Sequence, residues 1–463
     1  MSARPVDVQP FKRRGVCPAL SAPMQTGDGL LSRVAFASAI SPTDLGSLCA
    51  LATRHGNGLV DITARGGLQF RGLTEGSAVA LEVDVLGLGL PLRQGLAVET
   101  SPLAGMDETA VADTRDIVSR ISETAATLGL DDRLAAKMSV IIDGGGHVQM
   151  GELLADIRLK AVRPDDGIFW LLMLGGAQDK GLKAGLLRAD DAVDVVIELL
   201  SCLAERGPDA RGRDLEIETV RRICGERLLE RAVDVAPARV SSPSGLMRLV
   251  DYIHRPSISP LTNNRFAAAL APAFGQISAE ALAALCRQAS DLGIKLIRFG
   301  PAHGLFFIGT EDACQALLAR ADDAGFVTTA DDPRSAIAAC AGKPACASAF
   351  IATRALAEDA VIEIAGLLDG SLTLHLSGCG KGCAHPTSAL LAFSGSVEGL
   401  AFTYSGRASD IPDVVLPLVE QKAAFSRLAR LYEKEHKPGE NARALLARLG
   451  RQTIVAALRQ DDR

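Results

Sequence analysis

The stretch at residues 40–72 reads ISPTDLGSLCALATRHGNGLVDITARGGLQFRG, and the stretch at residues 277–309 reads ISAEALAALCRQASDLGIKLIRFGPAHGLFFIG. The two stretches align without a gap and are identical at twelve positions, where chance would give about three. Self-similarity of this extent indicates an internal repeat. We therefore interpret the second stretch as a duplicate of the first, and we expect the fold to contain the same unit twice.

Each copy predicts a helix followed by a hairpin. In the first copy, apolar and small side chains recur at helical spacing, at Leu45, Leu48, Cys49 and Ala52. Gly56 ends the helix, and two short strands around 59–63 and 68–71 flank a glycine turn. One copy alone would leave its apolar face uncovered, so the two copies are expected to pair about a pseudo-two-fold axis. Cys49 and its counterpart Cys286 are then predicted to be core thiols.

A weaker similarity links the blocks that follow the two copies. Residues 137–176 and residues 372–406 each read as a strand, a glycine loop and a further strand. The chain is therefore predicted to have the order A, B, A′, B′. The predicted domains are one unit of paired repeats (1–95 with 236–310), a first α/β domain (96–235), a second α/β domain (311–410) and a helical extension (411–463).

Length, charge and hydropathy limit the possible classes of protein. At roughly 150 residues per domain, the 463 residues are expected to form about three globular units. The 49 Lys and Arg against 55 Asp and Glu give a net charge of −6, which disfavours nucleic acid and anionic lipid as partners. Apolar runs such as 168–174 are far shorter than the ~20 residues that span a bilayer. With no secretory signal visible, a cytoplasmic location is expected.

Four of the ten cysteines form two closely spaced pairs. Cys340 and Cys346 form C-x5-C in CAGKPAC, and Cys379 and Cys383 form C-x3-C in the glycine-rich run SGCGKGCAHP. Four thiolates from two loops suit a 4Fe–4S cluster, in which each iron takes one sulfur ligand, whereas zinc sites usually show C-x2-C spacing. We predict that these four cysteines bind one 4Fe–4S cluster. The alternative is four buried thiols that only fill space.

These motifs resemble those of the sulfite and nitrite reductase superfamily over about residues 20–406. The resemblance implies an α+β fold with a pseudo-two-fold duplication, in which a ferredoxin-like domain of paired half-repeats joins two α/β domains that hold the cluster and the substrate. The run TARGGLQF at 63–70 is similar to the T-x-R-Q-x-x-Q stretch of the superfamily, which places Arg65 where an arginine faces a tetrapyrrole. The reductases carry two lysines in an R-K-F-K motif. Lys137 matches the first of these lysines, whereas Ser139 replaces the second. An arginine of the reductases aligns near Gln94, so two of the four basic groups that bind sulfite are expected to be missing.

Three further motifs resemble the precorrin-3B synthase branch of this superfamily. They are GCGKGCAHP at 378–386, PMQTGDG at 23–29 and SPLAG at 101–105. The resemblance implies a monooxygenase of cobalamin biosynthesis that uses molecular oxygen, a 4Fe–4S cluster, a mononuclear non-haem iron and an external electron donor, NADH- or ferredoxin-linked. It would hydroxylate precorrin-3A at carbon 20 and close a γ-lactone, giving precorrin-3B.

The site residues follow from this resemblance and from the substrate's many carboxylates. Arg65 and Lys137 are expected to bind the substrate, and Lys381 and His385 are expected to act in catalysis. Alternating apolar and polar residues over 372–377 predict a half-buried strand with His375 on its polar side. His375 and His147 are weaker candidates, and no histidine spacing in the sequence identifies the ligands of the mononuclear iron. Two other functions remain open at this point: a sirohaem-dependent sulfite or nitrite reductase, and a non-catalytic cluster-bearing protein that binds tetrapyrroles.

Overall fold

A computed structural model describes residues 19–164, 167–229, 258–329 and 331–459. The two repeats form equivalent halves of one unit. The first half contains β1 (Met24–Thr26), β2 (Gly29–Val34), α1 (Pro42–His55), β3 (Leu59–Ile62), β4 (Leu68–Leu73) and α2 (Glu75–Gly87). The second contains β10 (Ile258–Leu261), β11 (Arg265–Leu270), β12 (Gln276–Ser278), α7 (Ala279–Asp291), β13 (Leu296–Phe299), β14 (Leu305–Gly309) and α8 (Glu311–Asp323). The predicted helix and hairpin are therefore present in both copies.

A residue of each half forms a β-bridge with a strand of the other half. Ile277 in β12 lies opposite Val60 in β3, and Ile40 forms an isolated bridge with Ile297 in β13. Ile40 and Ile277 are equivalent positions of the repeat, as are Val60 and Ile297. Each half therefore completes the other half's sheet through the same residue, which confirms the predicted pseudo-two-fold pairing.

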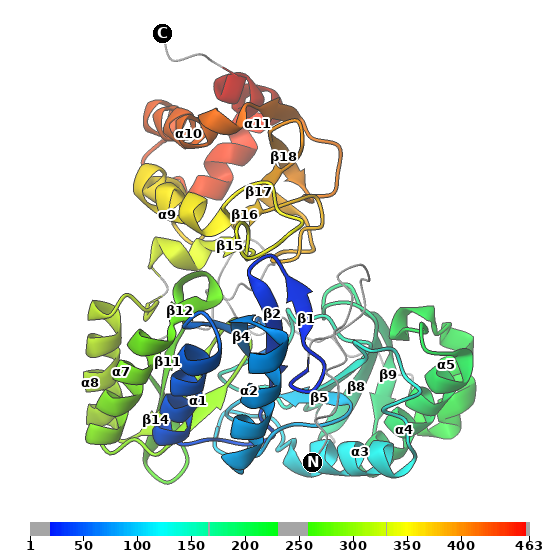
Figure 1. Ribbon diagram of the computed structural model, residues 1–463. Helices are drawn as coiled ribbons and strands as arrows, with labels where there is room; N and C mark the ends of the chain where they lie inside the picture. Colours follow the sequence, from blue (N-terminus) through cyan, green and yellow to red (C-terminus); the bar gives the residue numbers. More distant parts are fainter. Residues whose placement is uncertain (1–18, 165–166, 230–257, 330, 460–463) are drawn as a thin grey trace.

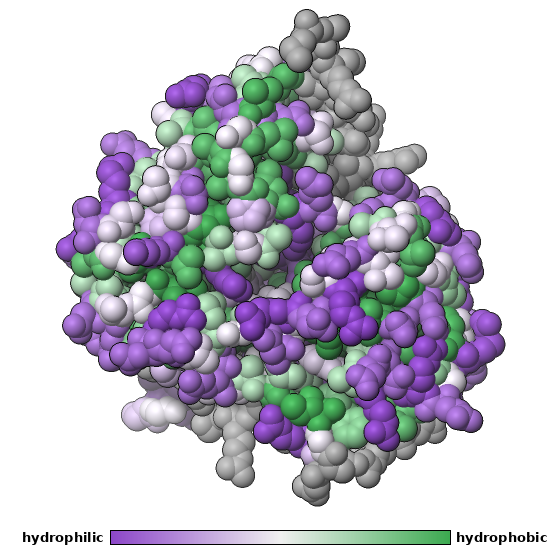
Figure 2. All heavy atoms as spheres, turned by 90° about the horizontal axis from the view of Figure 1, so that it is seen from below, coloured by the Kyte–Doolittle hydropathy of each residue, from purple (hydrophilic) through white to green (hydrophobic). Residues whose placement is uncertain are grey.

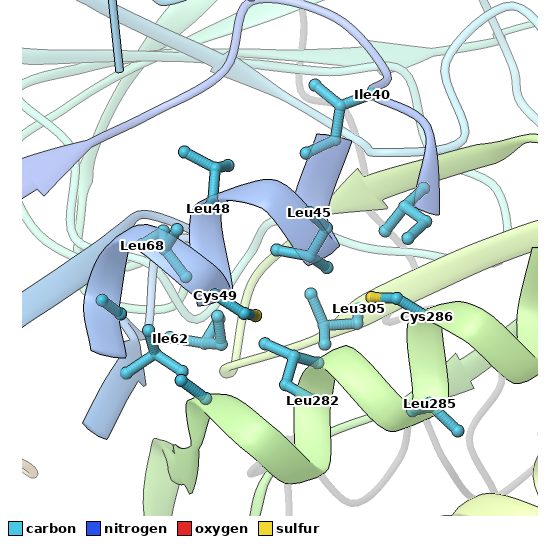
Figure 3. Close-up of a cluster of buried hydrophobic side chains, with 14 of the residues drawn as sticks. Ile40, Leu45, Leu48, Cys49, Ile62, Leu68, Leu282, Leu285, Cys286 and Leu305 are labelled. Atoms are coloured by element: carbon cyan, nitrogen blue, oxygen red, sulfur yellow. The ribbon is translucent and has the colours of Figure 1, made fainter. Parts of the chain in front are cut away.

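Helices α1 and α7 pack against each other at the centre of this unit. Each begins at a serine N-cap: the Ser41 side chain accepts a hydrogen bond from the Asp44 amide, and Ser278 plays the same part in α7. Leu45, Leu48, Leu282 and Leu285 are almost fully buried. Figure 3 shows Leu45 and Cys49 of α1 facing Leu282 and Cys286 of α7 between the two helices. Cys49 and Cys286 lie in the same core, as predicted. Burial raises the pKa of Cys49 to about 12, so this thiol stays protonated.

The two α/β domains repeat one sheet topology. The first has strand order β5-β6-β7-β8-β9 and the second has β15-β16-β17-β18-β19. In both sheets the first three strands run parallel to one another, the fourth strand pairs antiparallel with the third, and the fifth pairs antiparallel with the fourth. The first domain comprises β5 (Ala97–Thr100), α3 (Arg115–Thr127), β6 (Ser139–Asp143), β7 (Ile157–Val162), β8 (Phe169–Leu174), β9 (Leu182–Leu187), α4 (Ala189–Arg206) and α5 (Ile217–Cys224). The second comprises β15 (Ile337–Ala339), α9 (Thr353–Glu363), β16 (Leu374–Ser377), β17 (Ala389–Gly395), β18 (Leu400–Gly406), β19 (Val414–Leu416), α10 (Gln421–Glu435) and α11 (Ala442–Arg459).

Two expected boundaries need correction, and each block expected to contain two strands and a glycine loop holds a further strand. Helix α8 packs into the core of the paired repeats, so the second half extends past residue 310. Helices α10 and α11 share one core with β16–β19, so residues 411–459 belong to the second α/β domain; together they form the upper part of Figure 1. The central strands β7 and β17 were not predicted. The expected start of the second half at residue 236 lies outside the described residues.

The surface fits the moderate net charge. Seen from below, hydrophilic side chains cover much of the molecule and apolar ones form smaller patches between them (Figure 2). Within the described residues, none of the helices combines the length and apolar character that crossing a membrane would require.

Candidate iron–sulfur and substrate site

The two cysteine loops follow neighbouring parallel strands, β15 and β16, and therefore leave the sheet at the same edge. The Cys340 amide donates a hydrogen bond to the Leu376 carbonyl at 3.2 Å. The Phe350 amide, a few residues beyond Cys346, donates to the Gly378 carbonyl at 2.7 Å. Backbone hydrogen bonds thus hold the C-x5-C loop against the start of the C-x3-C loop.

Glycine is required where these loops meet. The Gly378 amide donates to the Sγ atom of Cys340 at 3.1 Å, a contact that stabilises a thiolate. A Cβ atom at position 378 would lie 2.6 Å from the Cβ of Ala349, which is closer than side chains approach. Any larger residue would push the two loops apart. The glycines around the thiols therefore serve close approach of the backbone, as the sequence indicated.

The four thiols lie within electrostatic reach of one another. The pKa of Cys383 is raised first by burial and then by the neighbouring Cys340, Cys379 and Cys346, while Lys381 opposes the rise. Yet no group of three or more His, Cys, Asp or Glu among the described residues converges closely enough to hold a single metal ion. Four thiols on two loops at one end of a sheet provide the number of sulfur ligands that a 4Fe–4S cluster takes.

The two predicted catalytic residues lie in and just after the C-x3-C loop. Lys381 Nζ donates to Ser348 Oγ at 2.9 Å, which joins this loop to the segment that follows Cys346. His385 Nε2 lies 3.0 Å from Thr387 Oγ1 and 3.4 Å from the Ser388 carbonyl, and burial lowers its pKa. Both side chains are therefore beside the thiols, and their catalytic roles stay a prediction.

The expectation for His375 is wrong in one respect. It was placed on the polar side of a half-buried strand, but β16 runs between two parallel neighbours and every residue in it is buried. Neither ring nitrogen of His375 has a hydrogen-bond partner in the described part of the chain, and burial lowers its pKa to about 4. Its ring packs edge-on against His385, with 5.6 Å between the centroids. A neutral imidazole thus lies beneath the cysteine loop.

A second group of charges surrounds Arg65. Its guanidinium donates to the carboxylate of Glu99 and to the carbonyl of Leu154, so it links the first half-repeat to the first α/β domain. Arg93 approaches the same Glu99 carboxylate at 3.7 Å. Glu99 is buried, whereas both arginines remain partly exposed. Arg93 stands one residue before Gln94, and it shares the Glu99 carboxylate with Arg65.

Lys137 occupies an exposed position just before β6, and its carbonyl accepts a hydrogen bond from Arg211 at 3.1 Å. Ser139, at the position of the second lysine, is buried, and its Oγ lies 3.5 Å from the same Leu154 carbonyl that Arg65 contacts. The start of β6 is therefore next to Arg65. Lys137 lies two residues before Ser139 and is exposed, and its role in substrate binding stays a prediction.

His147 lies in the glycine loop after β6, the counterpart of the cysteine loop after β16. Its Nδ1 atom is 2.8 Å from the carboxylate of Asp107, which also accepts hydrogen bonds from the backbone and hydroxyl of Thr109. Burial raises the pKa of Asp107, but these hydrogen bonds outweigh it and lower the pKa to about 2. Nothing places this pair beside the thiols, so it is not part of the cluster site.

Comparisons with known proteins agree with this geometry. The family model described as the nitrite/sulfite reductase ferredoxin-like half domain matches residues 22–84. A precorrin-3B synthase of Sinorhizobium sp is 39% identical over 459 residues, which cover 97% of this chain and 95% of the relative. A sulfite reductase (ferredoxin) of Mycolicibacterium paratuberculosis is 23% identical and covers 80% of this chain and 71% of its own.

Among solved structures, the Mycobacterium tuberculosis NirA protein superimposes with a TM-score of 0.73 at 21% sequence identity. The match covers 93% of this chain and 85% of that one, and it shows that the α+β fold is shared. The similarity to the Sinorhizobium relative is much higher and extends over nearly the whole of both chains. The chain therefore belongs to the precorrin-3B synthase family, within the sulfite and nitrite reductase superfamily.

Proposed function

We propose that this enzyme converts precorrin-3A to precorrin-3B in cobalamin biosynthesis. The full-length similarity to a precorrin-3B synthase carries this proposal, and the four thiols beside Lys381 and His385 supply a site suited to the redox chemistry. The reaction is hydroxylation at carbon 20 with closure of a γ-lactone. One oxygen atom of O₂ enters the product, while two electrons from an external donor and two protons reduce the other atom to water.

The cluster would be held by Cys340, Cys346, Cys379 and Cys383. When bound there, a 4Fe–4S cluster supplies one-electron transfer. The protein's own contribution is to keep the four sulfurs apart at one sheet edge and to place the Gly378 amide on Cys340. Lys381 adds a positive charge next to this anionic group, which favours its retention.

Substrate binding is assigned to the basic edge of the first half-repeat and the first α/β domain. Arg65 and Arg93 carry two positive charges, and they share the single negative charge of Glu99. With Lys137 exposed at the start of β6, this edge presents more positive than negative charge to a macrocycle with many carboxylates. Glu99 holds Arg65 in place before the substrate arrives, and ordering the cation in advance lowers the entropic cost of binding.

The mononuclear iron that the resemblance implies would need several protein ligands at one place. Within the described ranges, His, Cys, Asp and Glu side chains form no three-ligand group. The histidine–carboxylate pairs His55–Asp84 and His147–Asp107 are each engaged in their own hydrogen bond. The thiols and the basic edge are therefore the residues that carry the proposed function. The two electrons would come from an external donor, NADH- or ferredoxin-linked.

A sirohaem-dependent sulfite or nitrite reductase is the second candidate. Arg93 favours it, because a second cation shares the Glu99 carboxylate with Arg65. Ser139 disfavours it, because a buried hydroxyl replaces a cation at the start of β6. Six-electron reduction of a small anion depends on dense positive charge, so this loss has a large cost for that reaction.

We expect purified enzyme given anaerobic precorrin-3A, a reductant and then ¹⁸O₂ to form a product that contains one ¹⁸O atom. Mass spectrometry of the tetrapyrrole measures this directly, and ¹⁶O₂ with H₂¹⁸O is the matched control, since oxygen from water would then appear instead. A product without labelled oxygen would contradict the proposal. Strong Soret and red absorption bands in the purified protein would instead support the reductase.

A further inference from the structure

Arg71 in β4 is a buried cation whose guanidinium contacts the C-x5-C loop. Its Nε and Nη2 atoms donate to the two carboxylate oxygens of Asp28 at 3.0 and 2.9 Å, and Nη1 donates to Asp61 at 3.0 Å. Nη2 also donates to the carbonyl of Ala345 at 2.8 Å. Ala345 immediately precedes Cys346. One side chain of the first half-repeat therefore fixes the backbone next to a predicted cluster ligand.

The same carboxylates connect Arg71 to the other end of the loop. Asp61 accepts a hydrogen bond from Arg354 at 3.1 Å, in the first turn of α9. The neighbouring Thr353 donates through Oγ1 to the Cys340 carbonyl at 2.6 Å. Cys340 and Arg354 also interact electrostatically. Two guanidinium groups and two carboxylates thus form a neutral, buried network that reaches both cysteines of the C-x5-C loop.

The β1–β2 turn completes the support. The Gly27 amide donates to the Ala345 carbonyl at 3.2 Å, the same oxygen that Arg71 contacts. A Cβ atom at Gly27 would lie 2.4 Å from the Pro344 carbonyl oxygen, so the turn packs directly on the loop. Asp28 in this turn is the partner that Arg71 binds through two nitrogens. The turn and the arginine act on the same backbone atom together.

The second half-repeat carries different residues at the positions equivalent to this network. Arg298 stands at the repeat position of Asp61, and Ile308 stands at that of Arg71. Arg115, which begins α3 as Arg354 lies at the start of α9, pairs with Asp113 instead. Burial and the neighbouring Arg115 and Arg265 lower the pKa of Arg298, and its Nε has no hydrogen-bond partner among the described residues. The network therefore occurs in the half that contacts the C-x5-C loop, and the equivalent positions of the other half carry neither the carboxylate of Asp61 nor the guanidinium of Arg71.

We propose that Arg71, with Asp28, Asp61 and Arg354, is a positioning group that holds Cys340 and Cys346 for cluster binding. This inference depends on the cluster in the proposed function. Asp28 and Asp61 fix the orientation of Arg71, and Arg71 in turn fixes the Ala345 carbonyl. Groups that orient metal ligands without touching the metal commonly change metal retention when they are removed.

The test compares loss of the cluster in the full-length, anaerobically purified wild type and variants. We expect Arg71→Met to lose its visible cluster absorbance to an iron chelator about tenfold faster than wild type, the low end of the usual range for such groups. Arg71→Lys should fall between the two, because lysine keeps the charge but cannot contact Asp28, Asp61 and Ala345 together. Asp28→Asn, a milder change at the rim of the network, should accelerate the loss severalfold and keeps the test valid should Arg71→Met fail to fold.

Arg158→Met is the matched control. Arg158 is equally buried and donates to the backbone carbonyls of Met150 and Leu153 in the first α/β domain, away from the thiols. We expect this variant to lose stability while it keeps the wild-type rate of cluster loss per folded molecule. Wild-type rates in both Arg71→Met and Asp28→Asn, or an equal acceleration in Arg158→Met, would overturn the inference. Wild-type protein without iron would instead overturn the proposed cluster itself.

Discussion

Replacing Cys383 by serine is expected to give a colourless and inactive protein. A serine hydroxyl is a poor ligand for iron at neutral pH, and a cluster that loses one of four thiolates is exposed to solvent on that side. Cys383 is the most exposed of the four thiols, so the fold itself should tolerate the change. The visible spectrum, the iron and sulfide content and the rate of product formation measure the outcome.

Cys49→Ser is the control for this prediction. Cys49 lies in the core between α1 and α7, and its burial keeps the thiol protonated. We expect this variant to stay coloured and active while it loses about 1–3 kcal/mol of stability, because a hydroxyl is buried without an assured partner. Equal loss of colour in both variants would mean that the ligands have been assigned to the wrong cysteines.

Phe70→Ala and Phe307→Ala are each expected to destabilise the paired-repeat unit by about 3–5 kcal/mol, the usual cost of removing a fully buried phenylalanine. Both side chains have 0% exposure and belong to the same core. They also occupy the same register: Phe70 lies opposite Val60, and Phe307 lies opposite Ile297. Equivalent surroundings should produce similar losses, which chemical unfolding followed by circular dichroism measures.

Phe299→Ala is a suitable comparison for these two variants, because Phe299 packs against the same core but is only partly buried, so its removal should cost clearly less. A large loss for Phe70→Ala with almost none for Phe307→Ala would contradict a single core built from two equal halves. The repeat would then be a similarity of sequence without the shared packing described above.

The repeat and the cysteine loops were predictable because their signals are local. Identities at a constant offset revealed the two halves, and the spacing of Cys340 to Cys346 and of Cys379 to Cys383 lies within short segments. The reciprocal contacts of Ile40 and Ile277 follow from the same duplication, although the sequence alone could not give their partners.

Strand β7 was missed because its pattern reads as half polar. Arg158 and Lys160 interrupt its apolar residues, yet both are buried. Arg158 can be buried because it donates to loop carbonyls, and Lys160 because its Nζ donates to Gln178 Oε1 at 2.8 Å. Periodicity predicts burial from side-chain type and cannot anticipate distant partners that satisfy a charge.

The support of the cysteine loop could not be predicted for a related reason. Arg71 and Ala345 are 274 residues apart, and nothing near either of them in the sequence indicates the contact. The approach of Arg93 to Glu99 could not be predicted either, because it is a property of the folded chain. His375 was misplaced because alternation suggested one exposed face in a strand that has neighbours on both sides.

Mössbauer spectroscopy of the anaerobically purified, ⁵⁷Fe-enriched wild-type protein, combined with iron and sulfide analysis, tests most directly whether four thiols meet around one inorganic cube. We expect the quadrupole doublets of a 4Fe–4S cluster, with about four sulfides per chain. Sulfide-free protein, or a spectrum from one isolated iron in a tetrahedral sulfur site, would contradict the assignment of Cys340, Cys346, Cys379 and Cys383 to a single cluster.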